Sequence, residues 1–340
     1  MDAALFYEVG KPLRLDTVPD PEVQPGTVLV KVISSGLCDT DYRLMQTGLP
    51  MMEGPIIMGH QIAGSVAKVG PGVETVERGD SVLVHFLVHC GTCYYCQIGR
   101  ENLCENWQAI GVQRPGGFAQ FVLVPAGNVM KVPSGLSHAD ASLIPCGFAT
   151  PYRAINRAHV GMGDTVVIVG ARLWGLAAIR LCHLAGARAI VVDDDERRLT
   201  RAQQYGADAA FHVKADDLAD RVQSLTAGRG ADAALDFTGE AEAIATASQL
   251  LRKGGRLVVI GRAGCFGPVN VDILQLMFGE IELTGGCLVR GSEVRQLVEL
   301  VERGALDVTG LISDRIVLPE INDGFAMLAA DRPVSVVIDM

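Results

Sequence analysis

The chain has 340 residues, of which 49% are hydrophobic, and this is enough for two domains with separate packed cores. Its formal net charge is −10, and no run of Lys or Arg offsets it, so a nucleic-acid partner is not expected. The apolar stretch 166–192 is interrupted by Arg172, Arg180, His183 and Arg188, so we expect no membrane span. The first residues lack the pattern of a secretory signal, which predicts a cytoplasmic protein with reduced cysteines.

The first 150 residues are rich in Gly, Pro and Val, with short alternating apolar runs such as 27–32 and 80–84. This composition and alternation predict short strands joined by irregular loops, and therefore a compact β-rich domain. A later helix at 292–303 is followed by extended segments that end at 334–338. We expect this tail, from about residue 288, to return to the first domain.

Between these regions, apolar strands alternate with amphipathic helices. The predicted strands lie at 164–170, 188–193, 233–237, 256–260 and 281–284, and the clearest helices at 175–185 and 196–205. Near-continuous apolar strands in such a succession predict a doubly wound parallel sheet of the Rossmann type. The expected domains are therefore 1–152, 153–287 and the returning segment 288–340.

Four cysteines, Cys90, Cys93, Cys96 and Cys104, fall in one short segment within the region of about 88–106. Their close, paired spacing lets a single loop surround a tetrahedral ion, so the segment predicts a structural zinc site. Four thiolates leave no open position, and this metal is expected to stabilise the loop without taking part in chemistry. The alternatives are two disulfides or four unrelated buried cysteines.

A second set of potential ligands consists of Cys38, His60 and Cys146. Two cysteines and one histidine leave the fourth position of zinc open, which is the catalytic arrangement. The three residues are scattered over more than a hundred positions, so spacing alone leaves open the alternative of isolated buried side chains.

Several motifs follow one another in a fixed order, and together they resemble the zinc-dependent medium-chain alcohol dehydrogenases over essentially the whole chain. The motifs are Cys38-x-Thr40-Asp41, Gly59-His60-x-x-Ala63-Gly64, the four-cysteine segment, Cys146-Gly-Phe-x-Thr150 and the Rossmann unit. The resemblance implies a GroES-like catalytic domain and two zinc ions per subunit, one catalytic and one structural. It also implies a homodimer or homotetramer joined through the edge of the nucleotide domain's sheet.

The same resemblance implies roles for individual residues. Cys38, His60 and Cys146 would bind the catalytic zinc, Thr40 would begin the relay that removes the alcohol proton, and Asp41 would orient His60. Thr150 would pack near the nicotinamide. Gln61 departs from the family, which usually has glutamate there. The amide either makes the site more positive and slows ligand exchange at the metal, or it replaces the glutamate without functional effect.

The glycine turn after the first Rossmann strand reads Gly170-Ala-Arg172-Leu-Trp-Gly175. Gly170 fits the tight turn and Gly175 the close helix packing, but Arg172 replaces the middle glycine that lets the backbone approach a pyrophosphate. Its guanidinium either contacts a phosphate, obstructs the cofactor, or marks a different ligand. Asp193, at the end of the next strand, predicts NAD because a carboxylate there accepts ribose hydroxyls and repels the phosphate of NADP.

Other polar and sulfur-containing side chains are assigned structural roles. Asp194 and Asp195 are expected to begin a helix, and the neighbouring Arg197 and Arg198 to form a solvated face. Cys265 and Cys287 are expected to be core thiols. A group of four methionines fits either core filling or an adaptable pocket wall: Met45, Met51, Met52 and Met58.

Taken together, these features predict a zinc- and NAD-dependent alcohol dehydrogenase acting on a small or medium, largely apolar primary or secondary alcohol, or on the matching aldehyde or ketone. One alternative keeps the fold and metal without net redox turnover, using zinc as a Lewis acid or retaining the cofactor as a nicotinoprotein. A further alternative is a binding protein that has lost activity.

Overall fold

The computed structural model describes residues 1–49, 51–52, 54–261, 268–330 and 334–340. Its internal contacts divide the chain into two compact units. The first comprises Met1–Ala149, Leu288–Gly304 and Val308–Met340, and the second comprises Thr150–Cys287 with Ala305–Asp307.

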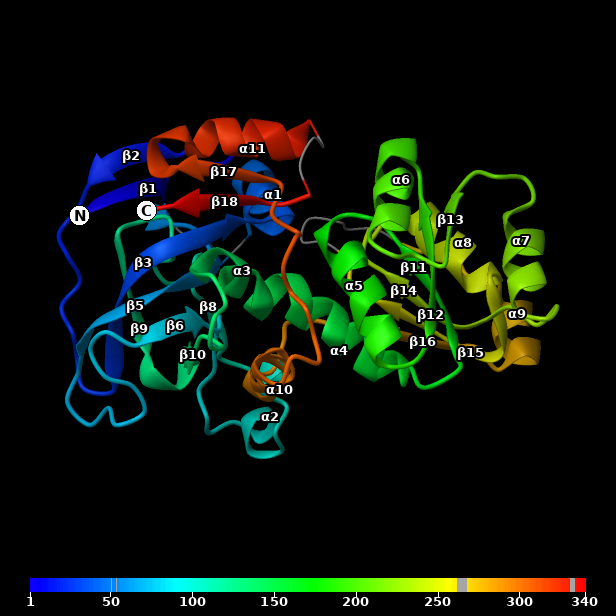
Figure 1. The fold of residues 1–340 in the computed structure, drawn as a ribbon, viewed down its shortest axis with the longest axis horizontal. Coiled ribbons are helices and arrows are strands. Elements are labelled where there is room, and N and C mark those ends of the chain that lie inside the picture. The colour runs from blue at the N-terminus through cyan, green and yellow to red at the C-terminus, as the bar shows by residue number, and fades with distance from the viewer. Residues whose placement is uncertain (50, 53, 262–267, 331–333) are drawn as a thin grey trace. The chain divides into compact units, whose positions relative to one another are not determined.

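The first unit is built on a seven-stranded sheet with β3 (Thr27–Leu37) near its centre. The order along the sheet is β10-β6-β5-β3-β18-β17, and β9 also pairs with β3. The other strands are β5 (Gln61–Val69), β6 (Ser81–Val84), β9 (Phe121–Pro125), β10 (Val129–Lys131), β17 (Asp314–Val317) and β18 (Val336–Asp339). Strand β18 runs antiparallel to β3, with Val336 opposite Leu37, so a distant segment lies beside β3 (Figure 1).

Smaller elements complete this unit. One three-stranded sheet joins β2 (Arg14–Thr17), β1 (Asp2–Phe6) and β4 (Ile56–Ile57), and β7 (Leu87–Val88) pairs with β8 (Gln108–Ala109). The helices are α1 (Asp39–Thr47), α2 (Tyr94–Gln97), α3 (His138–Leu143), α10 (Gly291–Glu302) and α11 (Ile321–Ala329), with the short helical turns η1 (Glu101–Leu103), η2 (Ala126–Asn128), η3 (Ile144–Phe148) and η4 (Leu318–Glu320).

The alternation along β3 explains how this sheet separates core from surface. Val28, Val30 and Val32 are buried, whereas Lys31 between them is exposed. Successive side chains of a strand point to opposite faces of the sheet. The valines therefore pack against the core on one face, and the lysine projects from the other face. The core continues through Phe118 and Phe325, whose rings lie 6.0 Å apart in an edge-to-face contact.

The second unit is a six-stranded parallel sheet in the order β13-β12-β11-β14-β15-β16 (Figure 1). Its strands are β11 (Thr165–Val169), β12 (Arg188–Asp193), β13 (Ala209–His212), β14 (Ala231–Asp236), β15 (Leu251–Val259) and β16 (Glu282–Gly285). The helices between them are α5 (Leu173–Leu184), α6 (Glu196–Gln204), α7 (Leu218–Leu225), α8 (Ala241–Gln249) and α9 (Ile273–Gly279), and α4 (Ala149–Ala158) precedes β11. The predicted fold class, a Rossmann sheet together with a β-rich domain, is confirmed.

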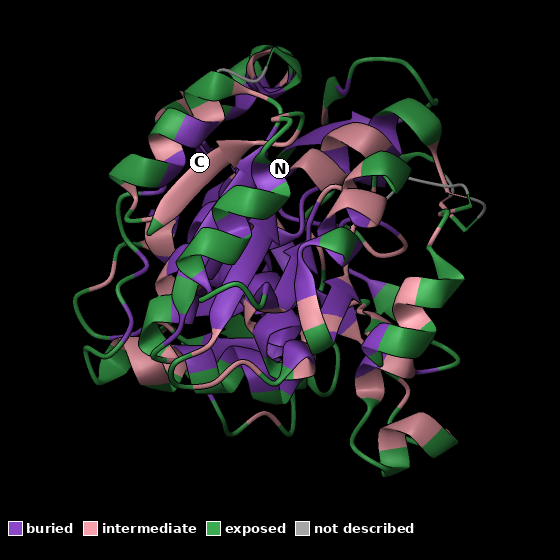
Figure 2. Cartoon of the chain, turned by 90° about the vertical axis from the view of Figure 1, so that its right-hand side faces the viewer, coloured by how far each residue is buried: buried purple, intermediate pink, exposed green. Residues whose placement is uncertain are grey.

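Burial explains why β11 and β12 were predictable from sequence. All five residues of β11 are buried, and only Arg188 of β12 is exposed. A central parallel strand is covered on both faces, so it becomes a continuous apolar run. Figure 2 shows the difference in burial between strands and helices. The strands in the interior are mostly buried (purple), and the helices carry exposed residues (green) on their outer sides. Within the described ranges, no helix has the length and apolar character that a bilayer crossing requires.

Candidate functional site

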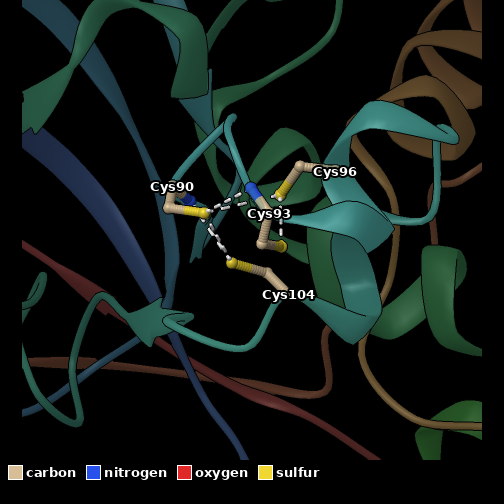
Figure 3. Close-up of side chains that lie close together, drawn as sticks. All are labelled: Cys90, Cys93, Cys96 and Cys104. Atoms are coloured by element: carbon tan, nitrogen blue, oxygen red, sulfur yellow. Dashed lines mark hydrogen bonds between the residues drawn. The ribbon is translucent and has the colours of Figure 1, made fainter.

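Four cysteine side chains converge around α2 and η1 (Figure 3). The Sγ atoms of Cys90 and Cys104 are 3.5 Å apart, those of Cys93 and Cys96 are 3.6 Å apart, and those of Cys90 and Cys96 are 3.9 Å apart. A tetrahedral zinc ion with Zn–S bonds of about 2.3 Å requires S–S separations of about 3.8 Å, whereas a disulfide bond measures about 2.05 Å. The cluster therefore fits a zinc ion and excludes the disulfide alternative.

Backbone N–H groups are directed at two of these sulfur atoms. The N–H of Cys93 donates to Cys90 Sγ at 3.3 Å, and the N–H groups of Cys90 and Asn106 donate to Cys104 Sγ, each at 3.3 Å. Backbone hydrogen bonds from Thr92 and Cys93 lower the pKa of Cys90 to about 5. Burial instead raises the pKa of Cys96 to about 12, so a metal ion must displace that proton when it binds.

The second cluster brings together Cys38, His60 and Cys146 from three separate segments. Cys38 is the N-cap of α1, where its Sγ accepts the N–H of Thr40 at 3.4 Å. His60 directly precedes β5, and Cys146 lies in η3. All three are buried, and their potential ligand atoms lie within 4.8 Å of one another. The alternative of isolated buried side chains is therefore excluded, and the donor set of two thiols and one imidazole suits zinc.

Asp41 lies behind this cluster, in the first turn of α1, and is fully buried. Its Oδ1 is 2.8 Å from His60 Nδ1. Because a carboxylate only accepts, Nδ1 carries the proton and Nε2 is left as the ligand atom.

The same contact controls the protonation of the cluster in the absence of metal. Burial acts to lower the pKa of His60, but the charge and hydrogen bond of Asp41, together with Cys38, raise that pKa well above its ordinary value. The hydrogen bond that the Cys38 thiol donates to Cys146, followed by burial, raises the pKa of Cys38 well above its ordinary value. Metal binding must therefore release protons from this cluster.

Gln61 and Thr40 lie next to the ligands in the chain. Gln61 begins β5 and is completely buried, and neither of its amide atoms has a hydrogen-bond partner among the described residues. A Cβ at Gly36 would lie 2.9 Å from Gln61 Oε1, so glycine at that position leaves room for the amide. Thr40 is half-buried in the first turn of α1. Thr150, in α4, is buried.

The glycine turn has a conformation suited to a phosphate-binding loop. Gly170 has a φ of 97°, which strongly favours glycine, and it separates β11 from α5. A Cβ at Gly175 would lie 1.9 Å from the carbonyl oxygen of Gly170, so only glycine allows this approach of helix and turn. Arg172 is half-buried and occupies the N-cap position of α5.

Asp193 has more protein partners than the sequence indicated. Its Oδ2 accepts the N–H of Ala171 at 2.7 Å, while its Oδ1 accepts the N–H of Asp195 at 3.0 Å and Nε of Arg198 at 2.7 Å. The Asp193 side chain is only 4% exposed and that of Arg198 15% exposed. The carboxylate is thus fixed against the glycine turn and partly neutralised.

The prediction that Arg198 belongs to a solvated face is therefore wrong, because its guanidinium also pairs with Asp194. Arg197, whose side chain is 69% exposed, does lie on the surface. Asp195 caps α6 by accepting the N–H groups of Arg197 and Arg198, which confirms its predicted role at the helix start.

Cysteine and methionine positions test the remaining structural predictions. Cys287 is exposed, so its assignment to the core is wrong, and Cys265 lies outside the described residues. Met45 and Met58 are buried as core filling, whereas Met51 is 49% exposed.

Phe86, which the motifs did not single out, lies against the second cluster. Its ring contacts that of His60 edge-on at a centroid distance of 5.3 Å, and it also contacts His85. Burial lowers the pKa of His85 to about 3, so this imidazole is neutral at physiological pH. No periodicity in the sequence distinguishes Phe86 from other core aromatic residues.

Comparison with known proteins agrees with this geometry. The family model described as alcohol dehydrogenase GroES-like domain matches residues 24–134, and the model described as zinc-binding dehydrogenase matches residues 175–303. An NAD-dependent alcohol dehydrogenase from Sulfurisphaera tokodaii is 30% identical over 333 residues, which cover 95% of this chain and 95% of that protein. An L-threonine 3-dehydrogenase from Anaeromyxobacter sp. (strain K) is 32% identical over 334 residues, covering 95% and 93%.

A solved structure shows the same likeness in three dimensions. It is a zinc-binding dehydrogenase from Sinorhizobium meliloti 1021 bound to NADP, with a TM-score of 0.93 and 29% identity, and the match covers 100% of this chain and 99% of that one. Both domain matches and the full-length relatives agree with the two cysteine-containing clusters and the parallel sheet. The chain therefore belongs to the zinc-dependent medium-chain alcohol dehydrogenase family and is an oxidoreductase.

Proposed function

We propose that this protein is an NAD-dependent alcohol dehydrogenase that transfers hydride reversibly between NAD and a small or medium-sized, largely apolar primary or secondary alcohol, or the matching aldehyde or ketone. The observation that carries the proposal is the buried cluster of Cys38, His60 and Cys146, with Asp41 fixing the imidazole. Three protein ligands of this kind leave one position for a substrate oxygen. The names of several relatives, which include NAD-dependent alcohol dehydrogenases, support the reaction type.

Each residue near the cluster has a proposed task. When bound there, zinc supplies a Lewis acid that lowers the pKa of an alcohol oxygen. Asp41 keeps the His60 proton on Nδ1, and the Thr40 hydroxyl receives the substrate proton and passes it toward solvent. The uncharged Gln61 keeps the cluster more positive than a glutamate would. The four-cysteine cluster has no open position, so we assign its zinc a structural role.

The proposed cofactor residues belong to the second unit. Gly170 and Gly175 shape the turn for a pyrophosphate at the start of α5, and Arg172 adds a positive charge there. Thr150 packs near the nicotinamide. Asp193 offers the remaining acceptor position of Oδ2 to a ribose hydroxyl and repels a 2′-phosphate, although Arg198 weakens that repulsion.

The first experiment is calorimetric titration of the zinc-loaded protein with NADH and, separately, with NADPH. Tighter binding of NADH would support the assigned role of Asp193. Equal affinities, or tighter binding of NADPH, would contradict it. Failure of both to bind protein shown to be free of nucleotide would contradict the proposed function itself. Nucleotide retained through purification would instead support the alternative of a non-exchanging cofactor.

Substrate class is then tested by following NADH absorbance with a panel of primary and secondary alcohols. The panel includes L-threonine, because several relatives carry the name L-threonine 3-dehydrogenase. Highest kcat/KM for apolar alcohols is expected. Preference for L-threonine would reassign the substrate, and absence of any turnover in protein that binds NADH would favour Lewis-acid chemistry without net redox.

We further propose that the protein is a cytoplasmic homodimer or homotetramer. Strand β16 is the edge of the six-stranded sheet, and nearby α9 exposes four large apolar side chains, which are Ile273, Leu274, Met277 and Phe278. A second copy would pair with the edge and cover these side chains. Light scattering is expected to give a molar mass that is two or four times the 36.1 kDa of one chain. The double variant Met277→Lys/Phe278→Lys is expected to have a lower molar mass. A monomeric unmodified protein would refute this assembly.

A further inference from the structure

A cavity of about 450 Å³ lies on the first unit, on the outward face of the sheet. Strands β3, β5 and β9 form its base, and its walls come from the segment before β3 and the turn before β6. Its lining includes Asp20, Leu29, Lys31, Lys68, Arg78 and Phe121. Lys31 is six residues before Leu37, the end of β3, or about 20 Å along the strand, so the cavity is separate from the cluster that follows at Cys38.

Strand register determines which side chains face the cavity. Lys31 is directly opposite Ser65 of β5 and Phe121 of β9, so these three side chains share one row and one face of the sheet. Leu29 lies on the same face two residues earlier and is 4% exposed. The cavity thus has an apolar floor, formed by Leu29 and Phe121, beneath a charged rim.

The rim carries an uncompensated positive charge. Lys31, Lys68 and Arg78 are exposed, and none of them forms an ion pair with a carboxylate in the part of the chain that the structure describes. Two acidic residues, one in the cavity lining and one next to the lining residue Gly79 in the chain, are paired elsewhere. Asp20 pairs with the amino group of Met1 at 3.0 Å, and Asp80 pairs with Lys131 at 3.0 Å.

The positive charge of the cavity is opposite in sign to the net charge of the whole molecule. The chain carries 39 acidic and 29 basic residues, so a solvated surface of this protein is on average acidic. The cavity lining contains three cations and one carboxylate, so even if Asp20 is counted in full despite its pairing with Met1, the local excess is at least two positive charges. Such an excess over an apolar floor attracts an anion that has an apolar body.

We propose that this cavity binds a small organic phosphate monoester whose apolar group rests on Leu29 and Phe121. The phosphate dianion matches the excess of two positive charges, and Arg78 offers a planar fork of donors suited to phosphate oxygens. The two lysines add point charges on the opposite strands, and Ser65 adds a hydroxyl in the same row. This site takes no part in hydride transfer.

The test uses phenyl phosphate as probe, titrated calorimetrically into the full-length zinc-loaded protein at low ionic strength. The cavity variant is Lys31→Gln/Lys68→Gln/Arg78→Gln. The control variant, Lys11→Gln/Arg14→Gln/Arg303→Gln, removes the same number of positive charges from the same unit outside the cavity and leaves the Lys131–Asp80 pair intact. We expect the cavity variant to bind about ten-fold more weakly or worse, and the control variant to bind like the unmodified protein.

Circular dichroism verifies that both variants are folded, and all six positions are exposed, so folding is expected to survive. Equal affinity in the cavity variant, or no binding to the unmodified protein, would overturn the proposal. Inorganic phosphate provides a second probe, which is expected to bind more weakly because it lacks an apolar group. If inorganic phosphate binds as tightly as phenyl phosphate, the role assigned to Leu29 and Phe121 is overturned.

Discussion

Replacing Asp41 tests how the fold prepares the three-ligand cluster for zinc. In Asp41→Ala, His60 Nδ1 loses the buried acceptor that lies 2.8 Å away, and the imidazole is free to rotate or to change tautomer. Loss of such a partner typically weakens metal affinity about 10- to 100-fold, which corresponds to about 1.4 to 2.7 kcal/mol. Asp41→Asn keeps an acceptor oxygen without the negative charge, and we expect a smaller loss.

The assay is competition for zinc against a chromogenic chelator, combined with a zinc count per chain. The four-cysteine cluster is an internal control, because it is separate from the cluster whose His60 is bonded to Asp41, and it is expected to hold its zinc in both variants. Unchanged affinity for the second zinc in Asp41→Ala would refute the role assigned to this carboxylate. Parallel loss of both zinc ions would show general unfolding instead.

The pH dependence of zinc affinity provides a second test with Asp41→Asn. Without metal, the Asp41 charge raises the pKa of His60, so protons compete with zinc over the pH range below that raised pKa. Asp41→Asn removes the charge, lowers the pKa of His60 and therefore moves proton competition to lower pH. The difference in zinc affinity between the unmodified protein and Asp41→Asn is expected to narrow as the pH falls. A constant difference would show that the charge does not control this proton.

Four further changes have defined outcomes. Gly175→Ala places a methyl group 1.9 Å from a backbone oxygen and is expected to lower the free energy of unfolding by about 2 kcal/mol or more. Gly127→Ala is the control, because nothing lies within 4 Å of the added methyl group and the free energy of unfolding is expected to change little. Equal melting temperatures of the two variants would contradict the packing argument. Cys104→Ser is expected to reduce bound zinc from about two ions per chain to about one, and retention of two would refute the four-thiolate assignment. Arg172→Gly is expected to weaken NADH binding by about ten-fold if the guanidinium contacts phosphate, and calorimetry showing tighter binding would instead establish obstruction. Gln61→Glu is expected to change kcat by more than it changes zinc content, and unchanged kinetics would identify the amide as a tolerated replacement.

Features encoded by spacing and periodicity were predictable from the sequence. The continuous apolar runs of β11 and β12 identified the centre of the parallel sheet, because buried strands need apolar residues on both faces. In contrast, β13 has only partly buried residues and did not stand out. The four close cysteines predicted one cluster without further context, whereas Cys38, His60 and Cys146 required a family resemblance, since long-range folding brings them together.

Features that depend on side-chain partners were not predictable. The sequence places Asp193 at a strand end, but it does not show that Arg198 turns back to pair with it. Adjacent acidic and basic residues around a helix start have several compatible pairings, and the choice depends on burial and rotamers. The exposure of Cys287 has the same origin, because an apolar-looking segment near an edge strand does not determine which side chains are covered.

The position of β18 beside β3 affects how the protein assembles while it is being synthesised. Leu37 pairs with Val336, so 336 − 37 = 299 positions of chain separate the two partners. At about 5 to 20 residues per second, the ribosome takes about 15 to 60 s to supply the missing strand. Cys38 directly follows β3, and β18 completes the pairing of that end of β3, so we expect its cluster to be fully formed only after the whole nucleotide unit has been made. The four-cysteine cluster spans only Cys90 to Cys104 and can capture its zinc early. The two metal ions are thus expected to enter the nascent protein in a defined order, with the structural ion first.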